Sequence, residues 1–250
     1  MKVAVTGAGG YIGRFVVKTL ADQGHEVVAI DFVHQGIDER AKICDVNIFS
    51  GEPDVYEKMG CPDSVIHLAW KDGFVHNSNA HMDNLSSHYK FLRNLVDAGC
   101  KNISVMGTMH EIGFYEGKID ENTPCNPLSQ YGIAKNALRQ ALLTYTKDKD
   151  VNIFWLRAYY ILGDDKKNNS IFAKLLAAAE AGKKEFPFTT GKAKYDFIQV
   201  DELAKQIVAA STQDKYTGII NVCSGKPVSL GERVEQFIKE KGLDISLQYG

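Results

Sequence analysis

The chain has 250 residues, of which 44% are hydrophobic and 24% are charged, and its formal net charge is −2. This composition is typical of a globular protein with a substantial core, and it gives no general attraction to nucleic acid or to anionic membranes. The N-terminus resembles a strand instead of a signal peptide, and five scattered cysteines argue against a disulfide framework or a structural metal, so we expect a cytoplasmic protein without a metal site.

The first thirty residues have the pattern of a strand, a glycine-rich turn, a helix and a second strand. The turn Thr6–Gly13 follows the apolar run that ends at Val5 and precedes a helical pattern from Arg14 to Leu20. Glycines let the backbone approach a pyrophosphate, and the N-terminus of the helix offers N–H groups to its negative charge. The sequence therefore predicts a dinucleotide site whose loop residues are Gly7, Gly10, Tyr11, Ile12 and Gly13.

Asp31 lies at the tip of the second strand, eighteen residues after Gly13. A carboxylate there can accept hydrogen bonds from the adenosine ribose and repel a 2′-phosphate, which favours NAD over NADP. NADP stays possible because a neighbouring lysine such as Lys42 can compensate for a phosphate, and Asp31 can also be a simple strand cap. Asp45, at the end of the next expected strand, is a candidate adenine contact or a solvated turn acid.

Strand and helix signals alternate as far as about Arg157, which predicts an α/β fold with a Rossmann-type doubly wound parallel sheet. Further strands are expected at residues 65–70 and 103–106, with a helix at about residues 82–98 between them. We expect residues 1–157 to form the NAD(P)-binding domain. Residues 158–250 are expected to form a small substrate-binding lobe, interleaved with the last strands of the sheet.

Three residues have the spacing of a hydride-transfer site. Tyr131 and Lys135 are four residues apart, so a helix presents both on one face. Tyrosine is a poor base at neutral pH, but a neighbouring ammonium group favours the phenolate. Thr108 follows a predicted strand, at the edge where such sheets bind ligands, and its hydroxyl can orient the reacting oxygen. In this interpretation Tyr131 moves the proton and a nicotinamide moves the hydride.

These motifs, in this order along nearly the whole chain, resemble the extended short-chain dehydrogenase/reductase family, in its nucleotide-sugar epimerase and dehydratase branch. The matching residues are Thr6–Gly13, Asp31, Asp45–Val46, His67–Ala69, Asn84, Gly107–Thr108, Gly113, Tyr131–Lys135, Leu156–Arg157, Tyr195–Glu202 and Asn221–Gly225. The resemblance implies additional NAD contacts at Val46, Leu68, Ala69 and Lys135. It also implies a homodimer formed through the helices near residues 82–98 and 131–147, although their leucines can equally face the sheet of their own chain.

Departures from the family pattern narrow the expected activity. Dehydratases of the family carry an acid pair after the active-site threonine, where this chain has Met109 and His110, so dehydratase activity is disfavoured. His110 can donate a proton to substrate or bond to nearby backbone, and Glu111 is expected to be structural or to face solvent. Tyr160 and Tyr195 replace an asparagine and an arginine that often contact the pyrophosphate, so the nucleotide part of the substrate is open.

Substrate contacts are predicted at Lys71, Met109, His110, Tyr160 and Tyr195. Lys166 and Lys167 are candidate phosphate contacts or solvated surface lysines. The leading interpretation is an NAD(P)-dependent oxidoreductase acting on a keto or hydroxyl carbon of a nucleotide-activated sugar, as a C4 ketoreductase. A 4-epimerase with tightly bound NAD uses the same three residues and is one alternative, and a non-catalytic dinucleotide sensor is another.

Overall fold

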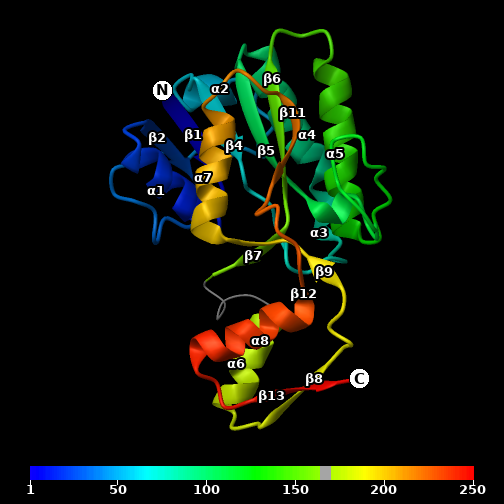
Figure 1. The fold of residues 1–250 in the computed structure, drawn as a ribbon. Coiled ribbons are helices and arrows are strands. Elements are labelled where there is room, and N and C mark those ends of the chain that lie inside the picture. Colours follow the sequence, from blue (N-terminus) through cyan, green and yellow to red (C-terminus); the bar gives the residue numbers. More distant parts are fainter. Residues whose placement is uncertain (164–169) are drawn as a thin grey trace. The chain divides into compact units, whose positions relative to one another are not determined.

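The computed structural model describes residues 1–163 and 170–250 (Figure 1). Lys166 and Lys167 lie outside the described residues. The chain divides into two compact units. The first unit consists of Met1–Ala158 and Val200–Val222, and the second consists of Tyr159–Gln199 and Cys223–Gly250.

The first unit is built on a seven-stranded sheet in the order β11-β6-β5-β4-β1-β2-β3, with every neighbouring pair parallel. Its strands are β1 (Lys2–Thr6), β2 (Glu26–Ile30), β3 (Lys42–Ile43), β4 (Ser64–His67), β5 (Asn102–Thr108), β6 (Asn152–Ala158) and β11 (Gly218–Val222). The direction of winding reverses between β1 and β4. Sheets of this kind bind ligands at the carboxyl edge beside that reversal. The predicted Rossmann-type sheet is confirmed.

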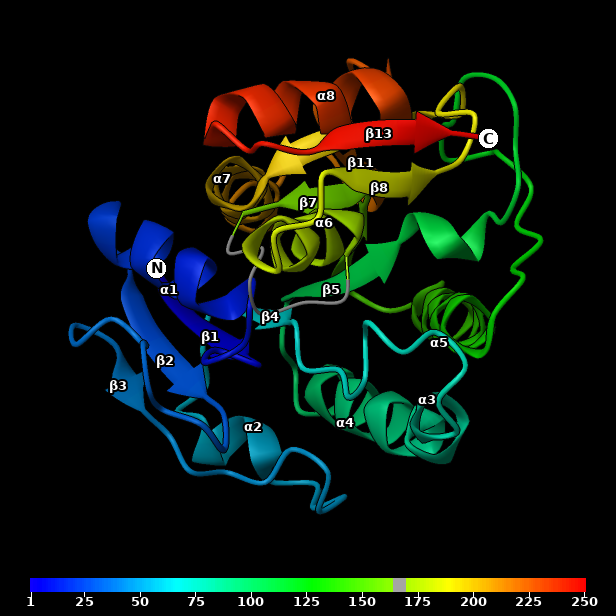
Figure 2. The same ribbon diagram turned by 90° about the horizontal axis from the view of Figure 1, so that it is seen from below.

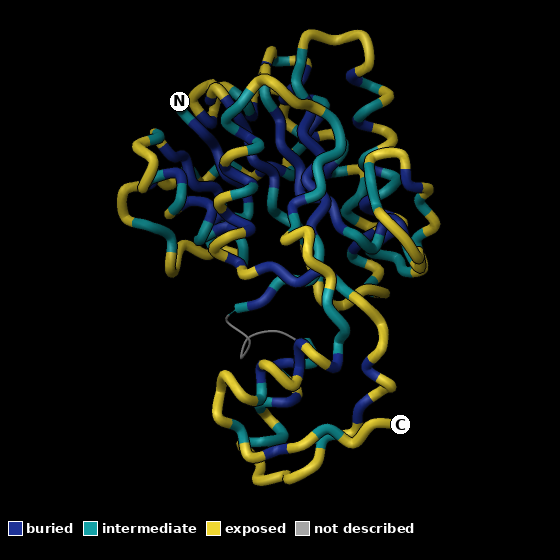
Figure 3. The backbone as a smooth tube through the Cα atoms, in the orientation of Figure 1, coloured by how far each residue is buried: buried dark blue, intermediate teal, exposed yellow. Residues whose placement is uncertain are grey.

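Helices cover both faces of this sheet (Figure 2). One face carries α1 (Gly13–Asp22) and α7 (Val200–Ser211), and the other carries α2 (Val55–Lys58), α4 (Leu85–Asp97) and α5 (Gln130–Thr146). The inner strands of the sheet are therefore largely buried, as their dark colour in Figure 3 shows, whereas the edge strand β3 is exposed and the edge strand β11 is mostly half-buried. The leucines of α4 and α5 that are fully buried face their own sheet: Leu92, Leu95, Leu138 and Leu142.

Three predicted elements are shorter than the sequence pattern indicated. The expected helix at residues 82–98 is divided at Asn84 into α3 (Ala80–Asp83) and α4. Strand β4 ends at His67, level with the end of its neighbour β1 at Thr6, although its other neighbour β5 continues to Thr108. Strand β3 is confined to Lys42–Ile43, and its partner β2 ends at Ile30.

The second unit is an α/β arrangement with its own core. Its elements are β7 (Tyr160–Leu162), α6 (Ile171–Glu180), β8 (Glu185–Phe188), β9 (Lys194–Tyr195), β10 (Phe197–Gln199), β12 (Val228–Ser229), α8 (Leu230–Lys241) and β13 (Ser246–Tyr249). The strands form three two-stranded pairs, β10 with β7, β12 with β9 and β13 with β8. Aromatic side chains dominate the core: Phe172, Phe188, Phe197 and Phe237. Within the described residues of both units, no helix has the length and apolar character needed to cross a membrane.

Candidate active site

The glycine-rich turn joins β1 to α1 and passes close to the end of β4. Gly7 has a φ of +72°, and a Cβ built on it would lie 2.6 Å from the backbone nitrogen of Ala69. A Cβ on Gly13 would lie 1.9 Å from the carbonyl oxygen of Gly7. The N-cap residue Ile12 makes no side-chain capping bond at the N-terminus of α1. This cradle fits a dinucleotide pyrophosphate, because the backbone can approach closely and helix N–H groups face the ligand.

Asp31 ties the glycine turn to the loop that follows β2. One carboxylate oxygen accepts a hydrogen bond from the Gly9 N–H at 3.0 Å, and the other accepts one from the Val33 N–H at 3.1 Å. Asp31 therefore does more than end a strand, although its contact with a ribose stays a prediction. Asp45 is exposed and lies after β3, with a carboxylate oxygen 3.3 Å from Nε2 of His34.

The remaining predicted cofactor residues gather at the same edge of the sheet. The N–H groups of Leu68 and Ala69 donate to the Thr6 carbonyl oxygen at 3.0 Å and to the Thr6 hydroxyl at 3.4 Å. The Gly10 N–H donates to the Gly7 carbonyl at 3.1 Å. Two more side chains are half-buried around the edge, those of Tyr11 and Val46. The structure thus collects residues from the ends of β1, β2, β3 and β4 around one turn.

Thr108 is the last residue of β5 and is 5% exposed. It is the N-cap of a short 3₁₀ helix, η1 (Met109–Glu111). Its hydroxyl accepts a hydrogen bond from the His110 N–H at 3.3 Å, and its own N–H donates to Oε1 of Glu111 at 2.7 Å. This reciprocal capping box fixes the Thr108 hydroxyl at the carboxyl edge of the sheet.

Tyr131 lies in the first turn of α5, and its hydroxyl meets Thr108. Ser129 caps this helix by accepting from the Gly132 N–H at 3.2 Å, and the Tyr131 N–H donates to the His76 carbonyl at 2.9 Å. The Thr108 side chain lies close enough to the Tyr131 hydroxyl to influence its pKa. Burial raises the pKa of Tyr131 to about 12, and the Thr108 side chain acts in the opposite direction. The structure therefore brings the predicted proton carrier and the predicted orienting hydroxyl together.

Lys135 lies one helical turn after Tyr131 and is 2% exposed. Its ammonium group donates to the Met106 carbonyl at 2.7 Å and lies 3.8 Å from the ring centroid of Trp70. Burial lowers the pKa of Lys135 to about 7, while Glu111 acts in the raising direction. The expectation that Lys135 lowers the pKa of Tyr131 is wrong for this structure. Burial dominates at the phenol, and the ammonium group is directed at Met106 and Trp70 instead.

Glu111 is fully buried, so of the two alternatives predicted for it, a structural role or a position facing solvent, the structure supports the first. Its carboxylate accepts the Trp155 indole N–H at 2.9 and 3.0 Å, in addition to the Thr108 N–H. Oε2 of Glu111 also lies 3.5 Å from Nε of Arg139 and 3.6 Å from a terminal nitrogen of Arg157. These contacts fix the Glu111 carboxylate and thereby support the capping box of Thr108. The spacing of the sequence motifs did not predict this cluster.

Tyr131 is surrounded by aromatic and imidazole rings that the motifs did not indicate. The ring centroid of Tyr131 lies 6.2 Å from that of Trp70, 5.8 Å from His76, 5.2 Å from His81 and 5.8 Å from His110. A signal was present in the sequence, because five of the seven histidines fall between residues 67 and 110. The sequence reasoning assigned a possible role only to His110.

The predicted substrate contacts in the first unit differ in their surroundings. Met109 and His110 are half-buried in η1 beside Thr108, and Lys71 is exposed. The ring of His110 lies 4.2 Å from that of His76. Burial lowers the pKa of His110 to about 4, with His76 contributing in the same direction. His110 is therefore neutral at pH 7, when its imidazole can exchange hydrogen bonds but carries no charge.

Tyr160 and Tyr195, the predicted substrate contacts of the second unit, lie against each other. Their ring centroids are 4.6 Å apart in an edge-to-face arrangement, and their side chains share a hydrogen bond. Burial raises the pKa of Tyr160 to about 12. Phe197 completes this aromatic group, at 5.5 Å from the Tyr160 ring.

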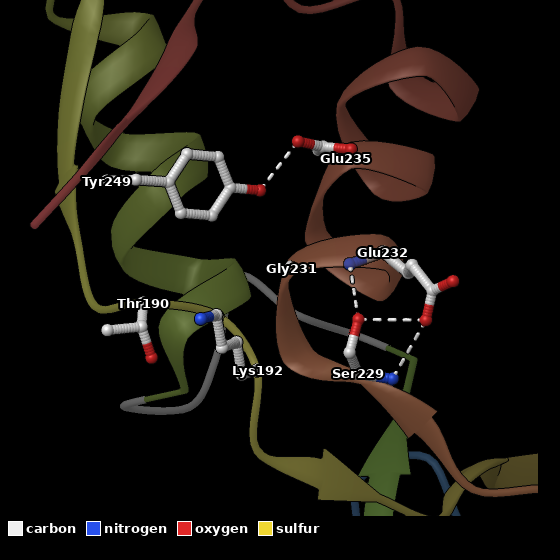
Figure 4. Close-up of a pocket in the computed structure, with 8 residues that line it drawn as sticks. Thr190, Lys192, Ser229, Gly231, Glu232, Glu235 and Tyr249 are labelled. Atoms are coloured by element: carbon white, nitrogen blue, oxygen red, sulfur yellow. Dashed lines mark hydrogen bonds between the residues drawn. The ribbon is translucent and has the colours of Figure 1, made fainter.

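A separate crevice in the second unit lies at the N-terminus of α8 (Figure 4). Ser229 caps the helix by accepting from the Glu232 N–H at 3.2 Å, and the Glu232 carboxylate accepts from the Ser229 N–H at 3.1 Å. The Tyr249 hydroxyl donates to Glu235 at 2.6 Å. The side chains of Ser229, Glu232, Glu235 and Tyr249 thus bond within the crevice, which Thr190 and Lys192 also line.

The fold and the glycine cradle define a dinucleotide-dependent α/β enzyme. The model of the NAD dependent epimerase/dehydratase family matches residues 3–223, and the chain belongs to this family. Its cofactor is NAD, as the family description states and as Asp31 predicted.

Individual relatives and solved structures agree with this assignment. The chain is 44% identical over 259 aligned residues to a dTDP-6-deoxy-L-talose 4-dehydrogenase (NAD(+)) of Aggregatibacter actinomycetemcomitans, covering 100% of this chain and 94% of the relative. Among solved structures, a UDP-N-acetylglucosamine 4-epimerase from Methanobrevibacter ruminantium M1 gives a TM-score of 0.85 at 21% identity, covering 100% of this chain and 84% of that one. A UDP-glucose 4-epimerase from Thermotoga maritima gives a TM-score of 0.83 at 20% identity, with 100% and 85% coverage. At this identity the solved structures establish the fold alone.

Proposed function

We propose that the protein transfers a hydride between NAD and C4 of a nucleoside diphosphate sugar, as a 4-ketoreductase that also runs as a 4-dehydrogenase. The observation that carries the proposal is the proximity of the Tyr131 phenol to the Thr108 side chain at the carboxyl edge of the sheet, the edge at which β1 leads into the glycine turn. The 44% identity to a 4-dehydrogenase along the whole chain supports the same reaction.

The cofactor would be held by the glycine turn and Asp31, and when bound it supplies or accepts the hydride. Tyr131 is a neutral phenol at pH 7, because burial raises its pKa to about 12. A neutral phenol can donate its proton to the keto oxygen as the hydride reaches the carbon, which yields the alcohol. Thr108 orients that oxygen. The Lys135 nitrogen lies 5.9 Å from the Tyr131 ring centroid, where its protonated form can act on a group bound beside Tyr131.

The residues after Thr108 fit a single hydride transfer better than an elimination. Methionine cannot move protons, and the imidazole of His110 is a weak base, because the pKa of its protonated form is lowered to about 4. Both side chains are half-buried next to Thr108, where we place the sugar ring. The apolar side chain of Met109 suits contact with a deoxy carbon of the sugar, and the imidazole of His110 suits a hydrogen bond with a hydroxyl group.

We further propose a dTDP-6-deoxyhexose as the substrate class, by analogy with the 44% identical relative. The aromatic group of Tyr160 and Tyr195 supports contacts with the nucleotide, because tyrosine rings stack on a base and their hydroxyls bond to phosphate oxygens. The second unit would then be the substrate lobe. A homodimer and a cytoplasmic location stay predictions from the sequence.

The test is an assay with a dTDP-4-keto-6-deoxyhexose and NADH. A ketoreductase consumes one NADH for each sugar reduced and releases the oxidised cofactor. A 4-epimerase instead retains NAD through purification and interconverts two alcohols without net change in the cofactor. Absence of turnover in both assays, with NAD still bound, would leave the non-catalytic sensor and overturn the proposal.

A further inference from the structure

Lys135 carries a buried charge that has no carboxylate beside it. Among the described residues it forms no ion pair, and its hydrogen-bond acceptor is the neutral Met106 carbonyl. The groups that interact with it electrostatically are Glu111, which is not in contact, and the imidazoles of His67 and His88. Burial lowers the pKa of His67 well below its usual value and that of His88 to about 3, so both rings are neutral. The ammonium group therefore needs compensation from another source.

The ring of Trp70 supplies that compensation. The nitrogen of Lys135 lies 3.8 Å from the Trp70 ring centroid, well inside the range in which an aromatic face attracts a cation. The attraction is strongest for tryptophan and grows when the pair is removed from water. Trp70 follows β4, directly after the predicted cofactor residues Leu68 and Ala69. The contact thus connects the end of β4 to the catalytic helix α5.

Two histidines hold the indole in place. Its Nε1–H donates to Nδ1 of His81 at 3.0 Å, and the ring of His88 stacks on it at 4.3 Å with an angle of 18°. An indole N–H can only donate, so Nδ1 of His81 must be an acceptor and its proton is on Nε2. That Nε2–H donates to the Val75 carbonyl at 2.9 Å. His81 is 1% exposed, and both of its ring nitrogens are satisfied in this one tautomer.

The second histidine is anchored to the strand that leads into the glycine turn. Nδ1 of His88 shares a hydrogen bond with Nε2 of His67 at 2.9 Å, and Nδ1 of His67 shares one with the Thr6 hydroxyl at 2.8 Å. No group of three or more His, Cys, Asp or Glu in the described residues is arranged to hold a metal ion, so these imidazoles act as hydrogen-bonding and stacking groups. Trp70 is fixed from two directions by groups that need no charge.

We propose that Trp70 is a positioning residue for the hydride transfer, which holds the Lys135 ammonium group beside Tyr131 and is itself held by His81 and His88. The inference rests on the proposed function for its effect on turnover. The contact itself belongs to the ligand-free protein and can be measured there. Loss of the aromatic face leaves the Lys135 charge without compensation, which lowers its pKa further and releases the side chain from its place.

The first experiment follows the Lys135 titration in ¹³C-lysine-labelled protein without cofactor, with the resonance assigned by its absence in Lys135→Met. We expect Trp70→Leu to lower the titration midpoint of Lys135 by at least about half a pH unit. Trp70→Phe retains an aromatic face, so it should recover at least about half of the difference between the Trp70→Leu midpoint and the wild-type midpoint. Tyr145→Leu is the matched control. Tyr145 lies on the same helix as Lys135, and its replacement removes a cation–π contact with Lys149 at 4.5 Å, which should leave the Lys135 midpoint unchanged. An unchanged midpoint in Trp70→Leu would overturn the proposal.

The second experiment measures turnover. Trp70→Leu should lower kcat at least about tenfold while KM for the nucleotide sugar stays within about threefold, because misplacing a group that acts on the reacting centre affects the chemical step. His81→Gln, whose amide oxygen can accept from the indole, should retain more activity than His81→Leu, and this pair decides the matter if Trp70→Leu does not fold. Equal activity in both His81 variants would contradict the account. If the wild type does not turn over, the proposed function fails, while the titration still tests the contact.

Discussion

Two buried charge clusters flank Thr108, and they are built in opposite ways. Glu111 has two guanidinium groups within 3.6 Å and an indole donor, and these partners oppose the rise in its pKa that burial causes. Lys135 has a carbonyl and an aromatic ring but no ion-pair partner among the described residues. A matched cluster supports the fold, whereas an unmatched charge costs stability and is retained where it has another use. The comparison assigns Glu111 to structure and Lys135 to function.

Lys135→Met should sharpen this contrast most. The pKa of Lys135 is lowered from 10.5 to about 7 in the folded protein. Between these values the unfolded chain binds more protons, so wild-type stability rises with pH from about 7 to 10.5. The Lys135→Met variant lacks that rise. At pH 6 its free energy of unfolding should exceed that of the wild type by on the order of 5 kcal/mol, reduced by the stabilisation that the Trp70 ring gives to the Lys135 charge. Turnover should be lost.

The measurement is urea unfolding of both proteins at pH 6 and pH 9. Because Tyr131 has its pKa raised to about 12, the phenol is neutral in both the folded and the unfolded state over this range and does not obscure the difference. A variant less stable than the wild type at pH 6 would show that the Lys135 charge supports the fold, and the contrast with Glu111 would disappear.

Arg157→Leu should have the opposite outcome. Arg157 is fully buried, and its removal leaves the Glu111 carboxylate with one fewer cation, which should destabilise the fold by about 3–5 kcal/mol at pH 7. Lys101→Ala is the control, since it removes an exposed ion pair with Asp150 and should leave the unfolding midpoint within experimental error. A loss below about 1 kcal/mol for Arg157→Leu would mean that the cluster is not a structural support.

Thr108 lies between the two clusters. Of the three substitutions, its replacement should have the smallest effect on the free energy of unfolding. Thr108→Val removes the acceptor for the His110 N–H and should cost about 1 kcal/mol. It also removes the partner of the Tyr131 hydroxyl, so kcat should drop at least about tenfold. Thr108→Ser keeps the hydroxyl and should preserve both properties. Kinetics and thermal unfolding of the two variants provide the check, and wild-type kcat in Thr108→Val would exclude the orienting role.

The glycine turn, Asp31, Thr108, Tyr131 and Lys135 could be located from the sequence because each depends on a short local pattern. Strand ends, helical spacing and glycines with a positive φ can each be predicted from residues that are close together in the sequence. The parallel sheet then places strand ends at a common edge. These regularities were enough to predict the Rossmann fold and to bring Thr108 and Tyr131 together.

The electrostatics of the site could not be predicted in this way. The pKa values of Tyr131 and Lys135 depend on burial, which arises when β4, β5 and α5 pack together. The contact between Trp70 and Lys135 joins residues 65 positions apart, and neither residue shows it in its local pattern. The spacing of residues in the sequence therefore predicted which side chains form the candidate site, whereas the packing of the fold determines their protonation states.

The most direct test of the proposed chemistry is the fate of a deuterium label. NADH carrying deuterium at its transferable position is incubated with a dTDP-4-keto-6-deoxyhexose and either the wild type or Tyr131→Phe, and the product is examined by NMR and mass spectrometry. The account predicts deuterium at C4 of the sugar with the wild type, and a loss of about 10²-fold or more in rate with the folded Tyr131→Phe variant. Deuterium at another carbon, or an undiminished rate in Tyr131→Phe, would contradict it.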